Sequence, residues 1–124
     1  MITFKELGSY GRLGNQLWQI SAVIGTAIRN NDGFIFPDWS YKNYFNLKNC
    51  YANNIKSNLN YKEPNFHFNE ISVFNTKNIV LNLSGYFQSF KYFEKFNSQI
   101  LNYLTPNFSI EREKICSIHI RRGD

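Results

Sequence analysis

Two short runs near the start of the chain, each typical of a strand, flank a segment with helical periodicity, and this order constrains the fold most. The first run covers residues 2–7, and the second covers residues 34–36 and stops at Pro37. From Asn15 onward, apolar residues recur at the spacing of one helical face. These residues are Leu17, Ile20, Ile24, Ala27 and Ile28. Since a helix between two strands is the usual crossover between parallel strands, the order predicts a parallel sheet of the doubly wound α/β kind.

Turn-forming residues lie at both ends of the expected helix. Gly8-Ser9-Tyr10-Gly11 forms a glycine-containing loop before it. Asn30-Asn31-Asp32-Gly33 supplies the stop after it, because glycine adopts the left-handed conformation that is common just past a helix.

The rest of the chain predicts two more strands and one more helix. Residues 79–83 are apolar and partly β-branched, as in a central strand, and residues 115–120 form a similar run. Between them, residues 90–104 repeat apolar side chains at helical spacing until Thr105-Pro106. Residues 38–78 keep no period of 2 or 3.6, so no element is predicted there.

Aromatic residues make up 18% of the 124 residues and are dense in that unassigned region. They could cover the sheet, line a sugar-binding groove by stacking, or fill gaps in the core, which is the commonest role of aromatic side chains. With 43% hydrophobic residues, the chain has enough apolar surface for one globular domain or part of one.

The formal charge of +5 arises from 14 lysines and arginines against 9 acidic residues, and it favours an anionic partner. Most basic residues are single lysines among asparagines, and the compact pair is Arg121-Arg122. This distribution favours a localised anion site over a broad surface for nucleic acid, so no nucleic-acid partner is expected.

Several classes of protein lack support in the sequence. Cys50 and Cys116 have no CxxC spacing and no paired histidines, so free thiols and no metal site are expected. A hydrolase is unsupported because there is no Ser-His-Asp set and no close carboxylate pair. Without a secretory signal or an apolar run of about 18 residues, a cytoplasmic protein is expected, with peripheral membrane association left open. The number of subunits is not predicted.

Two strand-to-helix junctions have the composition of ligand-binding loops. Gly11-Arg12-Leu13-Gly14-Asn15-Gln16 follows the first strand, where α/β sheets bind ligands, although a tight turn capped by Asn15 is an equally good interpretation. Gly85-Tyr86-Phe87-Gln88-Ser89 is the other junction. There, Gln88 and Ser89 could bond a sugar hydroxyl or, more commonly, cap the next helix.

The last predicted strand runs into His119-Ile120-Arg121-Arg122-Gly123-Asp124. Two adjacent arginines are hard to bury without an anion, and guanidinium groups offer paired donors that match a diphosphate. Asp124 could orient an arginine by ion pairing, and His119 could be a donor or a structural residue. The alternative is a pair of exposed arginines followed by a turn.

In order, these three segments resemble the motifs of glycosyltransferase family 11, the α-1,2-fucosyltransferases. GRLGNQLWQ is similar to the family's GGLGNQMFQ, SGYFQSFKYF to its GYFQSEKYF, and SIHIRRGD to its HxRRxD, which α-1,6- and protein O-fucosyltransferases share. The resemblance implies an inverting, metal-independent enzyme of the two-domain GT-B type, with a Rossmann-like parallel sheet and flanking helices. Such an enzyme transfers fucose from GDP-fucose to a galactose-containing glycan acceptor and needs no further cofactor.

The resemblance also implies roles for individual residues. Arg121 matches the arginine that neutralises the β-phosphate of the donor, and Arg121 and Asn15 are the expected catalytic groups. The expected donor-binding residues are Gly14, Asn15, Gln16, His119, Arg121, Arg122 and Asp124. Positive charge beside a departing diphosphate acts most strongly as charge develops in the transition state.

Departures from the family pattern leave other interpretations open. Arg12 stands where the family usually has a second glycine, as in the GRFGNQ of protein O-fucosyltransferases, and Phe90 stands where glutamate is common. The alternatives are another GDP-fucose-dependent transfer (α-1,6 or protein O-linked), a non-catalytic binder of carbohydrate or nucleic acid, and a gene fragment without a function of its own. Residues 1–124 are expected to be an incomplete N-terminal α/β domain that lacks the second, donor-binding domain and is inactive alone.

Overall fold

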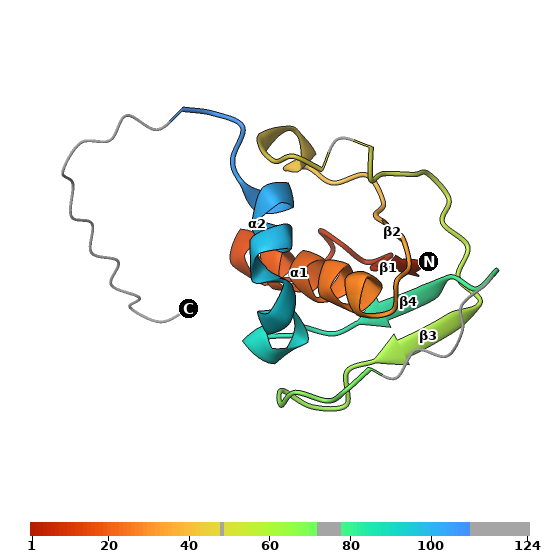
Figure 1. The fold of residues 1–124 in the computed structure, drawn as a ribbon. Coiled ribbons are helices and arrows are strands. Elements are labelled where there is room, and N and C mark those ends of the chain that lie inside the picture. The colour runs from red at the N-terminus through yellow and green to blue at the C-terminus, as the bar shows by residue number, and fades with distance from the viewer. Residues whose placement is uncertain (48, 72–77, 110–124) are drawn as a thin grey trace.

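The computed structural model describes residues 1–47, 49–71 and 78–109, which form a four-stranded sheet with helices packed beside it (Figure 1). The strands are β1 (Ile2–Thr3), β2 (Phe34–Ile35), β3 (Leu59–Lys62) and β4 (Leu81–Ser84). Their order across the sheet is β2-β1-β4-β3, and every pairing is parallel. The predicted α/β class, with a parallel sheet and flanking helices, is confirmed.

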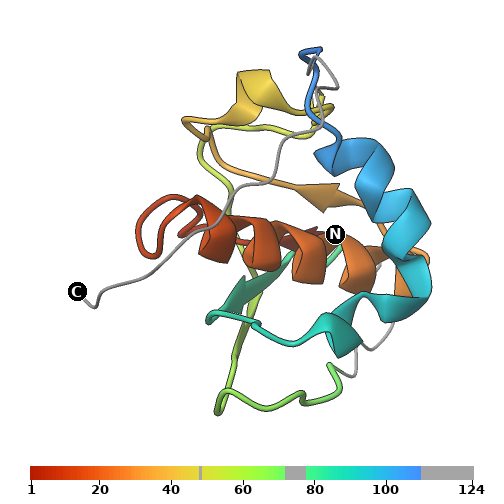
Figure 2. The same cartoon turned by 90° about the vertical axis from the view of Figure 1, so that its left-hand side faces the viewer.

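The helix α1 (Leu13–Arg29) lies against β1 and β2 at the centre of the core. Every residue from 19 to 27 is buried. The apolar ones join Ile2, Phe4 and Leu83 in one hydrophobic cluster. The burial is this extensive because the sheet covers one side of α1 and the chain that follows β4 packs on another (Figure 2).

The start of α1 differs from the predicted one, whereas its end at Arg29, directly before the predicted stop, agrees with the prediction. The helix begins at Leu13 rather than Asn15, and Arg12 precedes it in an extended conformation without a side-chain cap. Past the other end, the left-handed residue is Asn31, with a φ of 49°, rather than Gly33. Asparagine tolerates this conformation because its short polar side chain can bond locally. Asn31 therefore adopts the left-handed conformation that the sequence predicted for Gly33.

The segment after β4 is not the single helix that was predicted. It consists of the 3-10 turns η2 (Phe90–Tyr92) and η3 (Glu94–Phe96) and the helix α2 (Asn97–Leu104). The Tyr92 carbonyl accepts a hydrogen bond from Nη2 of Arg29 at 3.0 Å and occupies the space beside Gly25 of α1. Close packing on α1 thus orients that carbonyl, and regular α-helical bonding starts only at Asn97. As predicted, α2 ends before Thr105-Pro106.

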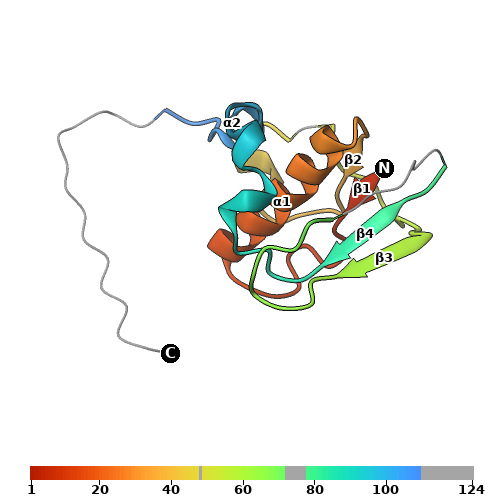
Figure 3. The same ribbon diagram turned by 60° about the horizontal axis from the view of Figure 1, so that its bottom comes forward.

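The two faces of the sheet differ in polarity. Ile2 and Leu81 are paired across β1 and β4 and belong to the hydrophobic cluster. Thr3, Asn82 and Asn60 alternate with them, and Nδ2 of Asn82 donates to Oδ1 of Asn60 at 3.2 Å. In the part of the chain that the structure describes, α1 and α2 lie side by side on one side of the sheet (Figure 3). A doubly wound sheet has helices on both faces, and the described residues supply the helices of one face.

The strand β3 lies in the region for which no element was predicted. Its sequence, LNYK, is largely exposed at the sheet edge and alternates apolar and polar residues over only four positions, too few to mark a strand. The same region contains the 3-10 turn η1 (Lys42–Tyr44). β1 is shorter than predicted, because the Lys5 amide donates to Oδ1 of Asn82 at 2.8 Å rather than extending the ladder. The strand predicted at 115–120 lies outside the described residues.

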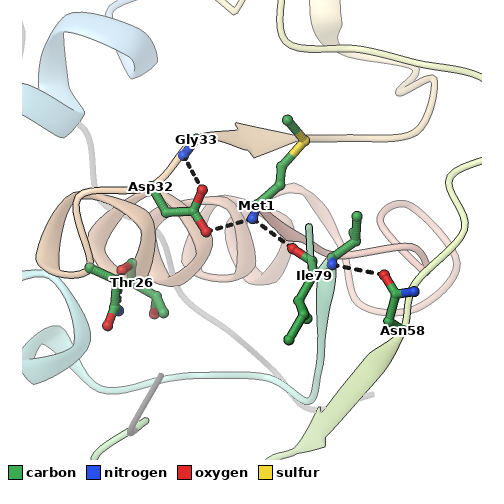
Figure 4. A network of polar contacts seen from close by, with 8 residues as sticks. Met1, Thr26, Asp32, Gly33, Asn58 and Ile79 are labelled. Atoms are coloured by element: carbon green, nitrogen blue, oxygen red, sulfur yellow. Dashed lines mark hydrogen bonds and ion pairs between the residues drawn. The ribbon is translucent and has the colours of Figure 1, made fainter. Parts of the chain in front are cut away.

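The amino group of the chain anchors the amino edge of the sheet (Figure 4). It donates to the Ile79 carbonyl at 2.9 Å and pairs with a carboxylate oxygen of Asp32 at 2.5 Å. The other oxygen of Asp32 accepts the Gly33 amide at 2.7 Å. These contacts tie together the beginnings of β1, β2 and β4. Across residues 1–47, 49–71 and 78–109, no helix is both long and apolar enough to cross a membrane.

Candidate functional site

The loops that follow β1, β3 and β4 meet at the carboxyl edge of the sheet, beside the first turn of α1 (Figure 3). This is the edge where parallel α/β sheets bind ligands. Because β1 and β4 are parallel neighbours, residues 8–12 and 85–89 lie next to each other. Two of the three predicted ligand-binding loops are thus brought together.

Gln16 supports the loop before α1 from inside the protein. It is only 6% exposed, and its Nε2 donates to the Gly11 carbonyl at 2.8 Å. Its Oε1 accepts the indole N–H of Trp39 at 2.7 Å. Gly11 itself is left-handed, with a φ of 77°, and Asn15 packs directly against it. The amide of Gln16 is therefore engaged at both ends in shaping the loop.

Asn15 joins the two loops. Its Oδ1 accepts a hydrogen bond from Nε2 of Gln88 at 2.6 Å, and Nε2 of Gln19 donates to the Gly85 carbonyl at 3.3 Å. The side chain of Asn15 does not cap α1, because the helix begins two residues earlier. Likewise, Ser89 precedes η2 without a side-chain cap. The capping interpretations of both loops are wrong, and Gln88 instead bonds across the sheet edge.

Gly14 lies exposed in the first turn of α1, where a Cβ would meet no atom within 4 Å. The amides of a first helical turn have no partner within the helix, and the helix dipole adds partial positive charge there. The exposed Arg12 precedes this turn. The surroundings of Gly14 therefore suit an anion that approaches the backbone closely.

Tyr10 connects the loop after β1 to the end of β4. Its hydroxyl accepts the Gly85 amide at 3.2 Å and donates to Oε2 of Glu6 at 3.3 Å. Oγ of Ser84 donates to the same oxygen of Glu6 at 2.8 Å. Burial raises the pKa of Tyr10 above its ordinary value, which further disfavours the phenolate and keeps the hydroxyl a donor.

Glu63, directly after β3, holds the loop that follows β4. Its Oε2 accepts the amides of Tyr86 and Phe87, each at 2.8 Å. Gly85 has a φ of 148°, and a Cβ there would lie 2.5 Å from the Cβ of Glu63. Sequence reasoning missed Glu63 because β3 is only four residues long and mostly exposed, so nothing marked Glu63 as the end of a strand.

Four of the expected donor-binding residues lie outside the described residues, and they are His119, Arg121, Arg122 and Asp124. The described ones are Gly14, Asn15 and Gln16, and all three lie at the carboxyl edge. Cys50 is a free, half-buried thiol whose pKa is raised by burial. Cys116 lies beyond the last described residue. No group of three or more His, Cys, Asp or Glu side chains able to hold a metal occurs among the residues described.

The fold and these loops define an α/β protein with polar and aromatic side chains gathered at the carboxyl edge of a parallel sheet. No protein-family model, no curated protein and no solved structure matches the chain. The function proposed below therefore depends on the motifs and on the geometry of this edge.

Proposed function

We propose that the chain is the N-terminal part of a GDP-fucose-dependent fucosyltransferase of the GT-B type, which acts with inversion on a galactoside hydroxyl. The observation that carries the proposal is the 2.6 Å hydrogen bond between Asn15 and Gln88. It joins the first and second fucosyltransferase-like motifs, 73 residues apart, at the edge where such sheets bind ligands. Two motifs that meet at one edge support a shared ligand.

In the proposed site, Gly14 and the first amides of α1 face the diphosphate of the donor. Asn15, oriented by Gln88, lies nearer the reaction centre, and Gln16 shapes the loop from beneath. An anion at this helix terminus is stabilised by unpaired amides and by the helix dipole. Proximity to the backbone is the reason for a glycine at position 14, because a Cβ would project into the space that the phosphate needs.

The remaining roles follow from the resemblance of the third motif. Arg121 neutralises the β-phosphate as the bond to fucose breaks, Arg122 and Asp124 support it, and His119 lies beside the nucleotide. Guanidinium charge acts on the developing negative charge of GDP, which makes GDP a better leaving group. A transferase built this way needs no metal ion in that role.

Binding of GDP to a longer protein that carries this chain together with the proposed donor-binding domain tests the site. We expect phosphorus NMR to show the β-phosphate signal of GDP shifting as protein is added, and Arg121→Ala to weaken binding at least about tenfold, because one charged hydrogen bond contributes roughly 1.5–3 kcal/mol. Lys56→Ala, which removes one exposed charge between β2 and β3, is the matched control. Equal GDP affinity in wild type and Arg121→Ala would contradict the role of Arg121.

Gly14→Ala tests the other side of the diphosphate. Because a Cβ at Gly14 meets no protein atom within 4 Å, the variant should keep the melting temperature of the wild type. We nevertheless expect weaker GDP binding, since the added methyl group occupies the approach to the first amides of α1. If Gly14→Ala bound GDP as tightly as the wild type, the N-terminus of α1 would not be part of the phosphate site.

A further inference from the structure

A second feature of the carboxyl edge is a pocket of about 330 Å³ beside the ends of β3 and β4. Its lining includes Tyr10, Glu63, Phe66, Ser84, Gly85 and Tyr86. Small-molecule sites span about 300–1,000 Å³, so this volume suits a ligand with a single ring. Asn15 and Gln88 are not among the lining residues, so the pocket is separate from the proposed phosphate site.

Aromatic rings form much of the pocket wall. Tyr86 packs edge-on against Tyr10, with ring centroids 5.6 Å apart, and lies 6.3 Å from Phe66. Phe66 is 71% exposed, so this large apolar ring is mostly outside the protein core. The negative face of an aromatic ring attracts C–H groups that carry partial positive charge. The wall therefore suits the C–H face of a saturated ring.

The polar groups of the pocket favour a hydrogen-bond donor. Among the described residues, Oε2 of Glu63 accepts two amides, whereas its Oε1 accepts a single long hydrogen bond, 3.4 Å, from the Tyr92 hydroxyl. A carboxylate oxygen can accept more than one hydrogen bond, so Oε1 keeps capacity for a ligand hydroxyl. Ser84 and Tyr10, at the same pocket, also bear hydroxyl groups.

The charges at the pocket disfavour an anion. Glu63 lines it, and Glu6 lies directly behind Tyr10 and Ser84, bonded to both hydroxyls. Lys62 also lines the pocket but is an exposed side chain at the sheet edge. A phosphate here would lie against the carboxylate of Glu63, with that of Glu6 bonded to the neighbouring hydroxyls, and such like-charge contact is unfavourable at short range. A neutral ligand with several hydroxyl donors avoids this repulsion.

We propose that this pocket binds a neutral pyranose sugar, stacked on Phe66 and Tyr86, with a ring hydroxyl donating to Glu63. The binding of a sugar depends on the pocket alone. That this sugar is the acceptor of the transfer rests on the proposed function, and it places the acceptor on the β3 side of the diphosphate.

Saturation-transfer NMR of the 124-residue chain with methyl β-galactopyranoside, in the absence of nucleotide, tests the pocket. We expect transfer from aromatic protons to the sugar, and Phe66→Ala to weaken binding about two- to twelvefold, as an aromatic contact contributes about 0.5–1.5 kcal/mol. Phe66→Ala should fold normally because the ring is exposed. Phe108→Ala removes another exposed phenylalanine, 55% exposed and absent from the pocket lining, and should bind like the wild type.

The outcomes separate the pocket from the proposed function. Sugar binding that Phe66→Ala weakens and Phe108→Ala does not supports the pocket, even if GDP fails to bind and the fucosyltransferase proposal falls. No transfer to the sugar at millimolar concentrations, or equal losses in both variants, overturns the pocket while leaving the GDP test intact. Displacement of the sugar by inorganic phosphate also overturns it, since the pocket would then bind an anion.

Discussion

Gly85 is the residue on which the loop after β4 depends. Its φ of 148° is accessible chiefly to glycine, and a Cβ there would lie 2.5 Å from the Cβ of Glu63 and 2.7 Å from its Oε2. The same Oε2 accepts the amides of Tyr86 and Phe87. Glycine therefore allows Glu63 to approach the backbone and to fix the aromatic wall of the pocket.

Gly85→Ala is expected to destabilise the protein by about 1–3 kcal/mol, because the methyl group displaces Glu63 and overpacks the loop. The free energy of unfolding in urea measures the loss. Gly33→Ala serves as the control, because a Cβ there finds only Cε of Met1 at 3.9 Å and the backbone is not left-handed. Similar decreases in the free energy of unfolding of the two variants would show that the Glu63 side chain moves aside without cost.

Tyr51 is a second residue whose burial affects the stability of the protein. Its hydroxyl is buried and has no hydrogen-bond partner in the described part of the chain. Burial, with smaller contributions from Cys50 and Asp38, raises the pKa of Tyr51 to about 12. A raised pKa means that the folded protein holds the neutral phenol while the unfolded chain ionises near pH 10. Stability from this group is complete below pH 10 and is lost as the pH rises toward 12.

Tyr51→Phe should remove this loss. At neutral pH we expect the variant to be as stable as the wild type or more stable by up to about 1 kcal/mol, because an unpaired buried hydroxyl is deleted. Between about pH 10 and 12, its melting temperature should fall less steeply than that of the wild type. Tyr44→Phe, at a side chain that is 53% exposed, is the control for deletion of a hydroxyl. Parallel pH profiles for wild type and Tyr51→Phe would contradict the argument.

At the scale of elements, α1 and the chain after β4 pack closely at Gly25. The position of a Cβ on Gly25 lies 2.7 Å from the Tyr92 carbonyl oxygen and 2.9 Å from Cβ of Phe93. Tyr92 itself is fully buried, and its ring packs edge-on against Phe87. Because Gly25 has no side chain, the η2 and η3 turns can pack directly against the backbone of α1.

Gly25→Ala should separate these elements and destabilise the protein by about 1–3 kcal/mol, although alanine is the better helix former. Gly14→Ala, in the same helix but facing open space, should be neutral or slightly stabilising. Thermal unfolding followed by circular dichroism compares the two. Equal stability of both variants would mean that the contact between α1 and Tyr92 adjusts without cost.

For the whole molecule, the central expectation is that the loops after β1 and β4 act as one unit through Asn15 and Gln88. Asn15→Ala and Gln88→Ala should each lower stability, and the double variant should lose less than the sum. We expect a coupling of about 0.5–1.5 kcal/mol, as for a side-chain hydrogen bond between neighbours. Urea unfolding of the four proteins measures it. Gln88→Ala combined with Asn53→Ala, an exposed residue in a different loop, should be additive.

By itself, the sequence determined the parallel α/β class, the location of α1 and the approximate positions of β2 and β4. Each of these follows from apolar periodicity or composition within one segment, which is a local property of the chain. The sequence also marked Gly14 and Asn15, because glycine and asparagine between a strand and a helix are locally distinctive. The contact of Asn15 with Gln88 could not be predicted, since nothing local relates residues 73 apart.

The tertiary structure alone decided β3, the break at Tyr92 and the role of Glu63. β3 is a strand because β4 pairs with it, not because its exposed residues favour one. The Tyr92 carbonyl is held by Arg29, 63 residues earlier, and Glu63 acts on amides 23 and 24 residues away. Strand pairing and side-chain bonds across a sheet depend on which segments become neighbours, and that is settled only when the whole core packs together.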